Sequence, residues 1–194
     1  MANEVYSAPQ SGEGEHQEII LVDENDNLLG FEEKLAAHQG EGKLHRAFSL
    51  FIFNSSGQLL LQRRAIQKYH FGGLWTNTCC SHPRKDEELL DAAHRRLREE
   101  LGFDTDIKEI SSFIYRACDE RSGLTEHELD HVLVGQFDGQ PRPDAAEIDD
   151  WRWVDLEPLI LDMQNNPGLY TPWFKIAIDR VIEWSLTNPP NKTS

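Results

Sequence analysis

The chain has 194 residues, a formal net charge of −15 and 39% hydrophobic residues, including five tryptophans. This length fits one domain, and the apolar content is sufficient for a buried core, which excludes a wholly disordered chain. A surface this acidic repels nucleic acids and anionic membranes unless its cations are gathered in one place. Residues 63–98 do gather them, with eight lysines and arginines against four acids, which favours a small anionic ligand.

The predicted elements run in the order strands, central helix, strands and two final helices. Residues 1–16 and 188–194 are rich in small and polar residues, so we expect mobile tails on a single domain covering 17–187. Strands are expected at 18–23, 45–54, 58–63, 107–117, 129–137 and 151–154, and helices at 86–101, 156–164 and 172–186. Residues 65–85 show no period and are expected to form an irregular loop. This order predicts an α+β fold, an α/β/α sandwich of mixed β-sheets flanked by helices.

The cysteine pattern and the lack of a recognisable signal peptide or membrane span predict a cytoplasmic protein. The three cysteines are an odd number, and Cys79 and Cys80 are adjacent, which is a poor disulfide framework. No apolar run approaches the length of a spanning helix, and the first residues do not resemble a signal peptide. We therefore expect no membrane partner and no nucleic-acid partner.

The helix expected at 86–101 carries a second pattern. Residues 81–103 resemble the Nudix box, Gly-x5-Glu-x7-Arg-Glu-apolar-x-Glu-Glu-x-Gly-apolar. The matching positions are Glu87, Arg95, Leu97, Glu99, Glu100, Gly102 and Phe103. Two positions depart from it, since Ser81 replaces the glycine and Arg96 replaces the first metal-binding glutamate. A guanidinium there weakens multi-metal hydrolysis and supplies an anion clamp, so the scaffold would bind a diphosphate without cleaving it.

Five further residues are candidate metal ligands. His38 and His45 lie seven residues apart around two glycines, and His82 lies in the irregular loop. Glu126 and Glu128 are separated by one residue at the mouth of an expected strand, so both carboxylates point to one face. Three imidazoles and two carboxylates suit an octahedral divalent ion better than a four-coordinate structural zinc. Spacing alone leaves open that these are exposed loop histidines and solvated glutamates.

Several segments outside the box closely resemble the type 1 isopentenyl-diphosphate isomerases, a family of the Nudix superfamily. These segments are 33–38, 44–49, 62–65, 75–83, 115–117, 126–128 and 171–173. The resemblance spans about residues 18–178. It implies a Nudix-type fold and the interconversion of isopentenyl and dimethylallyl diphosphate by moving a double bond one position, within isoprenoid synthesis. It also implies a small-molecule diphosphate as the partner and a monomer.

The resemblance assigns Cys80 and Glu128 as the acid/base pair, with Tyr115 hydrogen-bonded to the Glu128 carboxyl group. Protonating an unactivated alkene needs a strong acid, a matched base and a dry site. Nearby positive charge is expected to lower the pKa of Glu128 and to leave Cys80 deprotonated. Trp173 would face the developing carbocation. Which residue donates in each direction stays open.

The remaining assignments concern metals and the diphosphate. The resemblance implies one divalent metal, Mn²⁺ or Zn²⁺, at His38, His45, His82, Glu126 and Glu128. It implies Mg²⁺, bound together with the diphosphate, at Glu100. The residues it implies for substrate binding are Lys34, Arg64, Lys68, Ser81, Arg96 and Trp173.

Two other functions remain open at this stage. An ordinary Nudix hydrolase acting on a nucleoside or prenyl diphosphate would use the rest of the box, although Arg96 argues against it. A non-catalytic metal-binding or acidic interaction module would need no acid/base pair, so the loss of the Cys80 thiol would change no activity.

Overall fold

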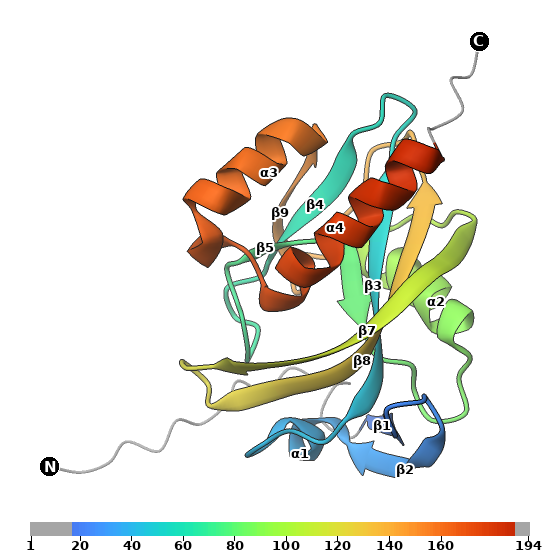
Figure 1. Cartoon of the computed structure of the whole chain (residues 1–194), viewed down its shortest axis with the longest axis vertical. Coiled ribbons are helices and arrows are strands. Elements are labelled where there is room, and N and C mark those ends of the chain that lie inside the picture. The colour runs from blue at the N-terminus through green and yellow to red at the C-terminus, as the bar shows by residue number, and fades with distance from the viewer. Residues whose placement is uncertain (1–16, 189–194) are drawn as a thin grey trace, which may run out of the picture.

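A mixed, curled β-sheet with helices on both faces forms the part of the chain that the computed structural model describes, residues 17–188. Its strands are β1 (Glu18–Val22), β2 (Leu28–Glu33), β3 (His45–Phe53), β4 (Leu59–Arg64), β5 (Trp75–Thr76), β6 (Cys79–Ser81), β7 (Ile107–Asp119), β8 (Leu124–Gln136) and β9 (Ile148–Val154). The helices are α1 (Lys34–His38), α2 (Leu89–Leu101), α3 (Leu156–Asn165) and α4 (Pro172–Thr187), with a 3-10 turn at Pro167–Leu169. The predicted α+β class is confirmed (Figure 1).

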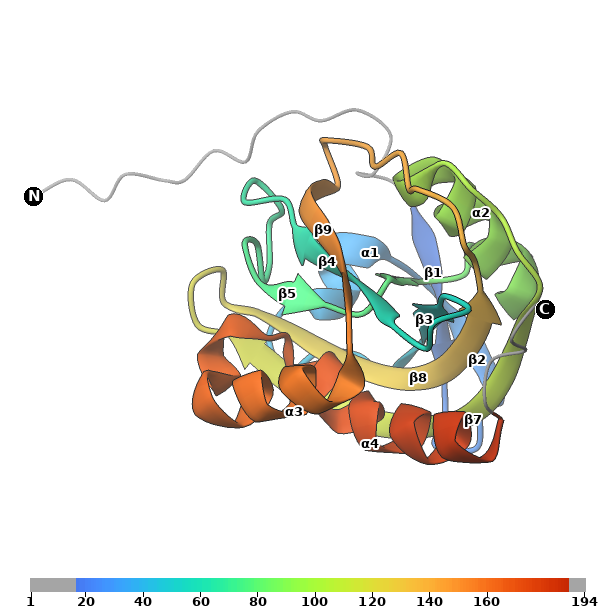
Figure 2. The same cartoon turned by 90° about the horizontal axis from the view of Figure 1, so that it is seen from above.

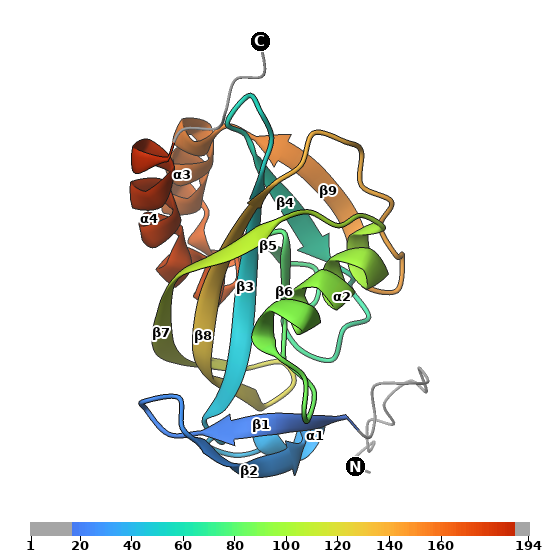
Figure 3. The ribbon, with the colours of Figure 1, turned by 90° about the vertical axis from the view of Figure 1, so that its right-hand side faces the viewer.

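Strand β3 is the centre of the sheet. It pairs in parallel with β8 along its whole length and antiparallel with β1, β4 and β6, while β7 forms a long antiparallel hairpin with β8. Helices α3 and α4 lie side by side on one face, and α2 lies on the other (Figures 2 and 3). A strand covered on both faces must be apolar at nearly every position, which explains the run from Ala47 to Phe53.

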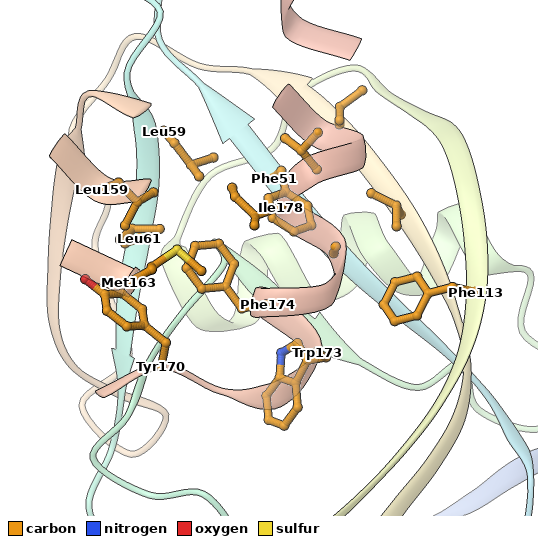
Figure 4. Packing of buried hydrophobic residues seen from close by; sticks show 14 of the residues in the cluster. Phe51, Leu59, Leu61, Phe113, Leu159, Met163, Tyr170, Trp173, Phe174 and Ile178 are labelled. Atoms are coloured by element: carbon orange, nitrogen blue, oxygen red, sulfur yellow. The ribbon is translucent and has the colours of Figure 1, made fainter. Parts of the chain in front are cut away.

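The two faces of β3 serve two separate clusters of buried side chains. Phe51 and Phe53 pack with residues of α3 and α4, including Phe174, in the cluster shown in Figure 4. Leu50 and Ile52 point the other way and pack against α2 through residues such as Leu97. The alternation follows from the two-residue period of a strand, and it fixes which face of the sheet each later residue occupies.

The structure differs from the predicted elements in several places. Strand β2 and helix α1 were not predicted, and β9 begins at Ile148 and not at 151. Helix α2 begins at Leu89 and not at 86, because Asp86 has a left-handed φ of +62° and belongs to a turn in which the Glu87 amide bonds to the Arg84 carbonyl. Strand β8 begins at Leu124, so the paired glutamates lie inside it and not at its mouth. The segment 65–85 contains two strands, β5 and β6. They are too short to show a periodic pattern in the sequence.

The predicted domain, 17–187, lies within the described residues, whereas the predicted tails, 1–16 and 188–194, lie outside them except for Asn188. Asn188, the first residue of the predicted C-terminal tail, caps α4 by donating its backbone N–H to the Trp184 carbonyl. Among the described residues, no helix combines the length and apolarity that a membrane crossing requires.

A short connection between α1 and β3 positions two of the predicted metal ligands. The Glu33 carboxylate caps α1 by accepting from the Leu35 and Ala36 amides. The chain then turns through Gly40 and Gly42, both with left-handed φ, before β3 begins. A side chain at Gly42 would place its Cβ 2.9 Å from the Thr125 carbonyl oxygen, whereas one at Gly40 would meet nothing within 4 Å.

These two glycines give a matched test of the turn. Gly40→Ala should lower the free energy of unfolding by about 1–2 kcal/mol, the cost of a left-handed alanine. Gly42→Ala should add a steric cost on the order of 1–3 kcal/mol, because β8 backbone cannot move aside freely. Urea unfolding followed by circular dichroism measures both. Equal losses in the two variants would show that the close approach to Thr125 does not constrain this turn.

Candidate active site and metal centre

The five residues predicted to bind a metal lie together at one end of the sheet. One donor atom from each lies within 4.8 Å of the others, and all five side chains are buried. They come from four places in the fold: the end of α1, the start of β3, the residue after β6, and two positions of β8 on one face. They are His38, His45, His82, Glu126 and Glu128. Parallel pairing of β3 with β8 sets His45 directly opposite Glu128.

The orientation of His38 and His45 shows that a cation fits between these groups. His38 Nδ1 lies 2.6 Å from the Lys34 carbonyl oxygen, and His45 Nδ1 lies 2.7 Å from that of Lys43. A carbonyl can only accept, so each Nδ1 carries the proton, and a neutral ring presents the Nε2 lone pair. His38 Nε2 lies 2.8 Å from Glu126 Oε2, so two acceptors face each other unless a proton or a metal ion lies between them.

The unpartnered Nε2 of His45 supports the same fit. Within the described chain, this buried nitrogen has no hydrogen-bond partner. His82 Nε2 lies 2.8 Å from Glu128 Oε1, and His45 Nε2 lies 3.6 Å from the same oxygen. Burial lowers the pKa of His38, but the Glu126 carboxylate outweighs burial and raises that pKa above its ordinary value. Imidazole nitrogens and carboxylate oxygens together suit Zn²⁺ or Mn²⁺.

The predicted acid/base pair lies beside this cluster. Tyr115, opposite Glu128 across β7 and β8, donates its hydroxyl to Glu128 Oε2 at 2.6 Å. Burial and the charge of Glu126 raise the pKa of Glu128, against the lowering expected from a bound cation. Cys80 lies on β6, where Arg64 Nη1 is 3.6 Å from its sulfur. Burial nevertheless raises the pKa of Cys80 to about 12. The surrounding protein groups by themselves therefore do not deprotonate Cys80, contrary to the expectation.

Trp173 belongs to the buried apolar cluster against which Cys80 packs. Trp173 is buried at the start of α4, and its Nε1 donates to Asn77 Oδ1 at 3.1 Å. The Arg64 guanidinium carbon lies 5.3 Å from the Trp173 ring centroid, and the Phe71 ring meets it edge-on at 5.4 Å. Figure 4 shows the indole at the edge of the large apolar cluster. Trp173 is therefore held in one orientation with apolar neighbours behind it.

The cations predicted to bind a diphosphate gather around Arg96 in the middle of α2. Arg64 ends β4, and Lys34 begins α1. Burial, together with the positive charge of Arg96 and Arg64, lowers the pKa of Lys34, which records how close these cations lie. Lys68 follows in the loop after β4, and Ser81 ends β6 between Cys80 and His82.

Carboxylates neutralise these cations in the structure. Arg96 donates to Glu99 at 2.8 Å, to Glu100 at 3.0 Å through Nε, and to Glu147 at 3.0 Å. Glu147 also pairs with Lys68. Glu100 is buried, and Gln62 Nε2 donates to its second oxygen at 3.3 Å. The predicted Mg²⁺ ligand and the predicted diphosphate clamp are thus hydrogen-bonded to each other.

Sequence reasoning missed two residues of this site. His70 is buried, and its Nε2 contacts Glu126 Oε1. Burial lowers the pKa of His70 to about 4, so this contact is a hydrogen bond from a neutral imidazole. Glu147 precedes β9 and contacts Lys68 and Arg96. Neither belongs to a motif or a periodic segment, so the sequence carried no signal for them.

The ion pairs of Glu147 predict a pH-dependent stability. Although burial raises it, the charges of Lys68 and Arg96 lower the pKa of Glu147 to about 2, from 4.5. Because the folded pKa is depressed, the stabilisation is complete above about pH 4.5 and is lost as the pH falls toward 2. Glu147→Gln should therefore cost on the order of 1–3 kcal/mol at neutral pH, with the difference narrowing below about pH 5.

Urea unfolding of both proteins between pH 7 and pH 3 measures this difference. Glu24→Gln, at an exposed position, serves as the control for the loss of one surface charge. A difference that stays constant across this pH range would contradict the assigned ion pairs.

Comparison with known proteins agrees with these observations. A model described as NUDIX domain matches residues 43–174. An isopentenyl-diphosphate Delta-isomerase 2 from Aromatoleum aromaticum is 56% identical over 165 residues, 85% of this chain and 86% of that protein. An isopentenyl-diphosphate Delta-isomerase from Burkholderia multivorans is 51% identical, over 84% of this chain and 92% of that protein.

Solved structures support the fold at lower sequence identity. DR0079 from Deinococcus radiodurans superposes with a TM-score of 0.64 at 21% identity, covering 77% of this chain and 90% of that one. A MutT protein from Methanosarcina mazei gives a TM-score of 0.60 at 20% identity, covering 75% and 96%. The two isomerases are more than half identical to this chain, and each match covers most of both proteins. The chain therefore belongs to the isopentenyl-diphosphate Delta-isomerase family, within the NUDIX-domain proteins.

Proposed function

We propose that this protein interconverts isopentenyl diphosphate and dimethylallyl diphosphate, and so supplies an allylic diphosphate for isoprenoid synthesis. The observation that carries the proposal is the buried Glu128 carboxyl group, hydrogen-bonded by Tyr115 at 2.6 Å beside the three-histidine cluster, in a chain about half identical to named isomerases. As implied by the family resemblance, we also propose that it acts as a monomer in the cytoplasm.

The reaction moves one double bond and leaves the diphosphate intact. A proton adds to the terminal methylene carbon, and a tertiary carbocation forms at its neighbour. A second proton then leaves from the carbon next to the cation on the diphosphate side. No bond to phosphorus changes, so the site must supply a proton donor, a proton acceptor and protection of the cation from water.

Cys80 and Glu128 are the two groups we assign to these proton transfers. Burial raises the pKa of both, so the protein groups alone favour the thiol and the protonated carboxyl. One of the pair must lose its proton before it can act as a base, and Arg64, 3.6 Å from the Cys80 sulfur, favours the thiolate. The Tyr115 hydroxyl donates to the Glu128 carboxyl group and so holds it in a fixed orientation.

Trp173 is the residue we assign to the carbocation. An indole face beside a desolvated cation is worth about 2 kcal/mol or more. The bond to Asn77 fixes the ring, and the apolar cluster behind it excludes water from that side. This arrangement stabilises positive charge without offering a nucleophile that would trap it.

We assign one divalent ion, Mn²⁺ or Zn²⁺, to His38, His45, His82, Glu126 and Glu128. When bound, it supplies positive charge that favours the ionised form of Glu128 and so makes its protonated form a stronger acid. Support comes from the five ligand atoms gathered within 4.8 Å of one another and from the unpartnered Nε2 of buried His45.

We assign the diphosphate to the cationic end of the site, with Mg²⁺ bound at Glu100. The side chains that would hold it are Lys34, Arg64, Lys68, Ser81 and Arg96. Charge-assisted hydrogen bonds from lysine and arginine suit phosphate oxygens, and the bonds that Arg96 and Lys68 now make to Glu147 show that both can reach an anion placed between them.

Exchange with heavy water tests the reaction itself. Incubation with isopentenyl diphosphate, Mg²⁺ and Mn²⁺ in deuterium oxide should give dimethylallyl diphosphate carrying deuterium in the new methyl group, seen by NMR. A Nudix hydrolase would instead release phosphate without an allylic product. A non-catalytic binding module would leave the substrate unchanged.

The acid/base assignment predicts the loss of activity in two variants. Cys80→Ala and Glu128→Gln should each lower kcat by about 10²–10⁴-fold or more, because general acid–base transfer contributes at least that much. Circular dichroism should show a retained fold. Cys118→Ala removes an exposed cysteine and should keep normal turnover. Normal turnover in either of the first two variants would overturn the assignment.

A further inference from the structure

His70 lies at the junction of the two halves of the proposed site. It belongs to the loop between β4 and β5, which also carries Lys68 of the diphosphate end. Its side chain is buried, and Nε2 contacts Glu126 Oε1. Nothing in the proposed reaction or in the five-residue cluster uses this imidazole, so its contact with a buried carboxylate needs an explanation.

His70 is not one of the five residues whose ligand atoms lie within 4.8 Å of one another. His38, His45 and His82 have ring centroids 4.7–5.4 Å from one another. His70 approaches His38 at 5.7 Å, and its partner is the other oxygen of Glu126, Oε1, whereas His38 lies against Oε2. The Glu126 carboxylate therefore lies between the cluster on one side and His70 on the other.

The loop holds His70 rigidly in this place. The Phe71 amide donates to Asp119 Oδ2 at 3.0 Å, and Arg64 Nη2 donates to the His70 carbonyl oxygen at 3.2 Å. The first bond ties the loop to the end of β7, and the second ties it to the diphosphate end of the site. Both backbone groups beside the ring are thus hydrogen-bonded. The imidazole itself is buried and packs against the rings of Tyr69 and Phe71, which restricts its rotation away from Glu126.

A buried carboxylate needs such a partner. Glu126 is 3% exposed, so an unpaired oxygen would lose its hydration without compensation. A carboxylate bound by one oxygen only can also rotate, which would turn Oε2 away from His38. Carboxylates that bind metals are commonly hydrogen-bonded on the side away from the ion, and these bonds set ligand orientation.

We propose that His70 is a positioning residue of the metal centre: its Nε2–H holds Glu126 Oε1, so that Oε2 faces the His38, His45 and His82 cluster. The inference rests on the proposed metal site. The His70 carbonyl oxygen also accepts a hydrogen bond from Arg64, and Lys68 lies two residues earlier in the same loop, so this loop contacts both ends of the proposed site.

The test is metal affinity, measured on the full-length protein with Mn²⁺ and Zn²⁺ by competition with a chromophoric chelator. His70→Leu should weaken binding by about 10–100-fold, the usual cost of losing such a partner. His70→Gln, whose amide can reach the same oxygen, should recover most of the affinity. His94→Asn, on the outer face of α2, is the matched control and should bind as the parent protein does.

Co²⁺ loading adds a readout that general destabilisation does not move. The visible spectrum of the Co²⁺ protein should change in His70→Leu and return toward that of the parent in His70→Gln, because it reports ligand geometry. Thermal unfolding of the metal-free variants checks that each is folded at the temperature of measurement.

The outcomes separate this inference from the proposed metal site. Weak binding in Glu126→Gln together with unchanged affinity and spectrum in His70→Leu would overturn the role of His70 and leave the site intact. Absence of Mn²⁺ and Zn²⁺ binding in the parent protein would overturn both. Equal losses in His70→Leu and His70→Gln would overturn the hydrogen bond as the cause.

Discussion

The parallel pairing of β3 with β8 is the constraint on which the rest of the site depends. It sets His45 opposite Glu128, and the two-residue period of β8 then brings Glu126 to the same face. The other edge of β8 pairs with β7, which places Tyr115 beside Glu128. A shift of one residue in the β3–β8 ladder would turn both glutamates away from the histidines, and one in the β7–β8 ladder would turn Tyr115 away from Glu128. Sheet register and site geometry are therefore specified together.

Burial gives this site its chemistry as well as its shape. In the same low-dielectric space it raises the pKa of Cys80 to about 12 and raises that of Glu128, while the histidines present unpartnered nitrogens. A buried imidazole lone pair that lacks a partner is costly, and a bound cation would remove that cost. Metal binding and folding of this end of the sheet are therefore expected to support each other thermodynamically.

The sequence predicted the parts of this site that depend on local pattern. The spacing of Glu126 and Glu128 indicated a shared strand face, and the box offsets placed Arg96 beside Glu100 on one helix; the structure agrees with both. It could not predict His70 or Glu147, because their partners lie 56 and 51 residues or more away in the chain and loop paths decide the meeting. Helix α2 and strand β8 were also misplaced at their starts, where a turn at residue 86 and long-range pairing override local preference.

In the proposed function, the same long-range contacts explain how an acidic chain accepts an anionic substrate. Arg96 occupies a box position where a carboxylate would hold metal, and three surrounding carboxylates, Glu99, Glu100 and Glu147, balance it in the structure. Lys68 shares Glu147. A diphosphate that arrives with Mg²⁺ brings negative charge for the cations and positive charge for Glu100, so it can exchange partners without leaving a buried charge unpaired. This exchange explains why a cationic clamp and an acidic helix face occur together, and it favours a metal-bound diphosphate over a bare one.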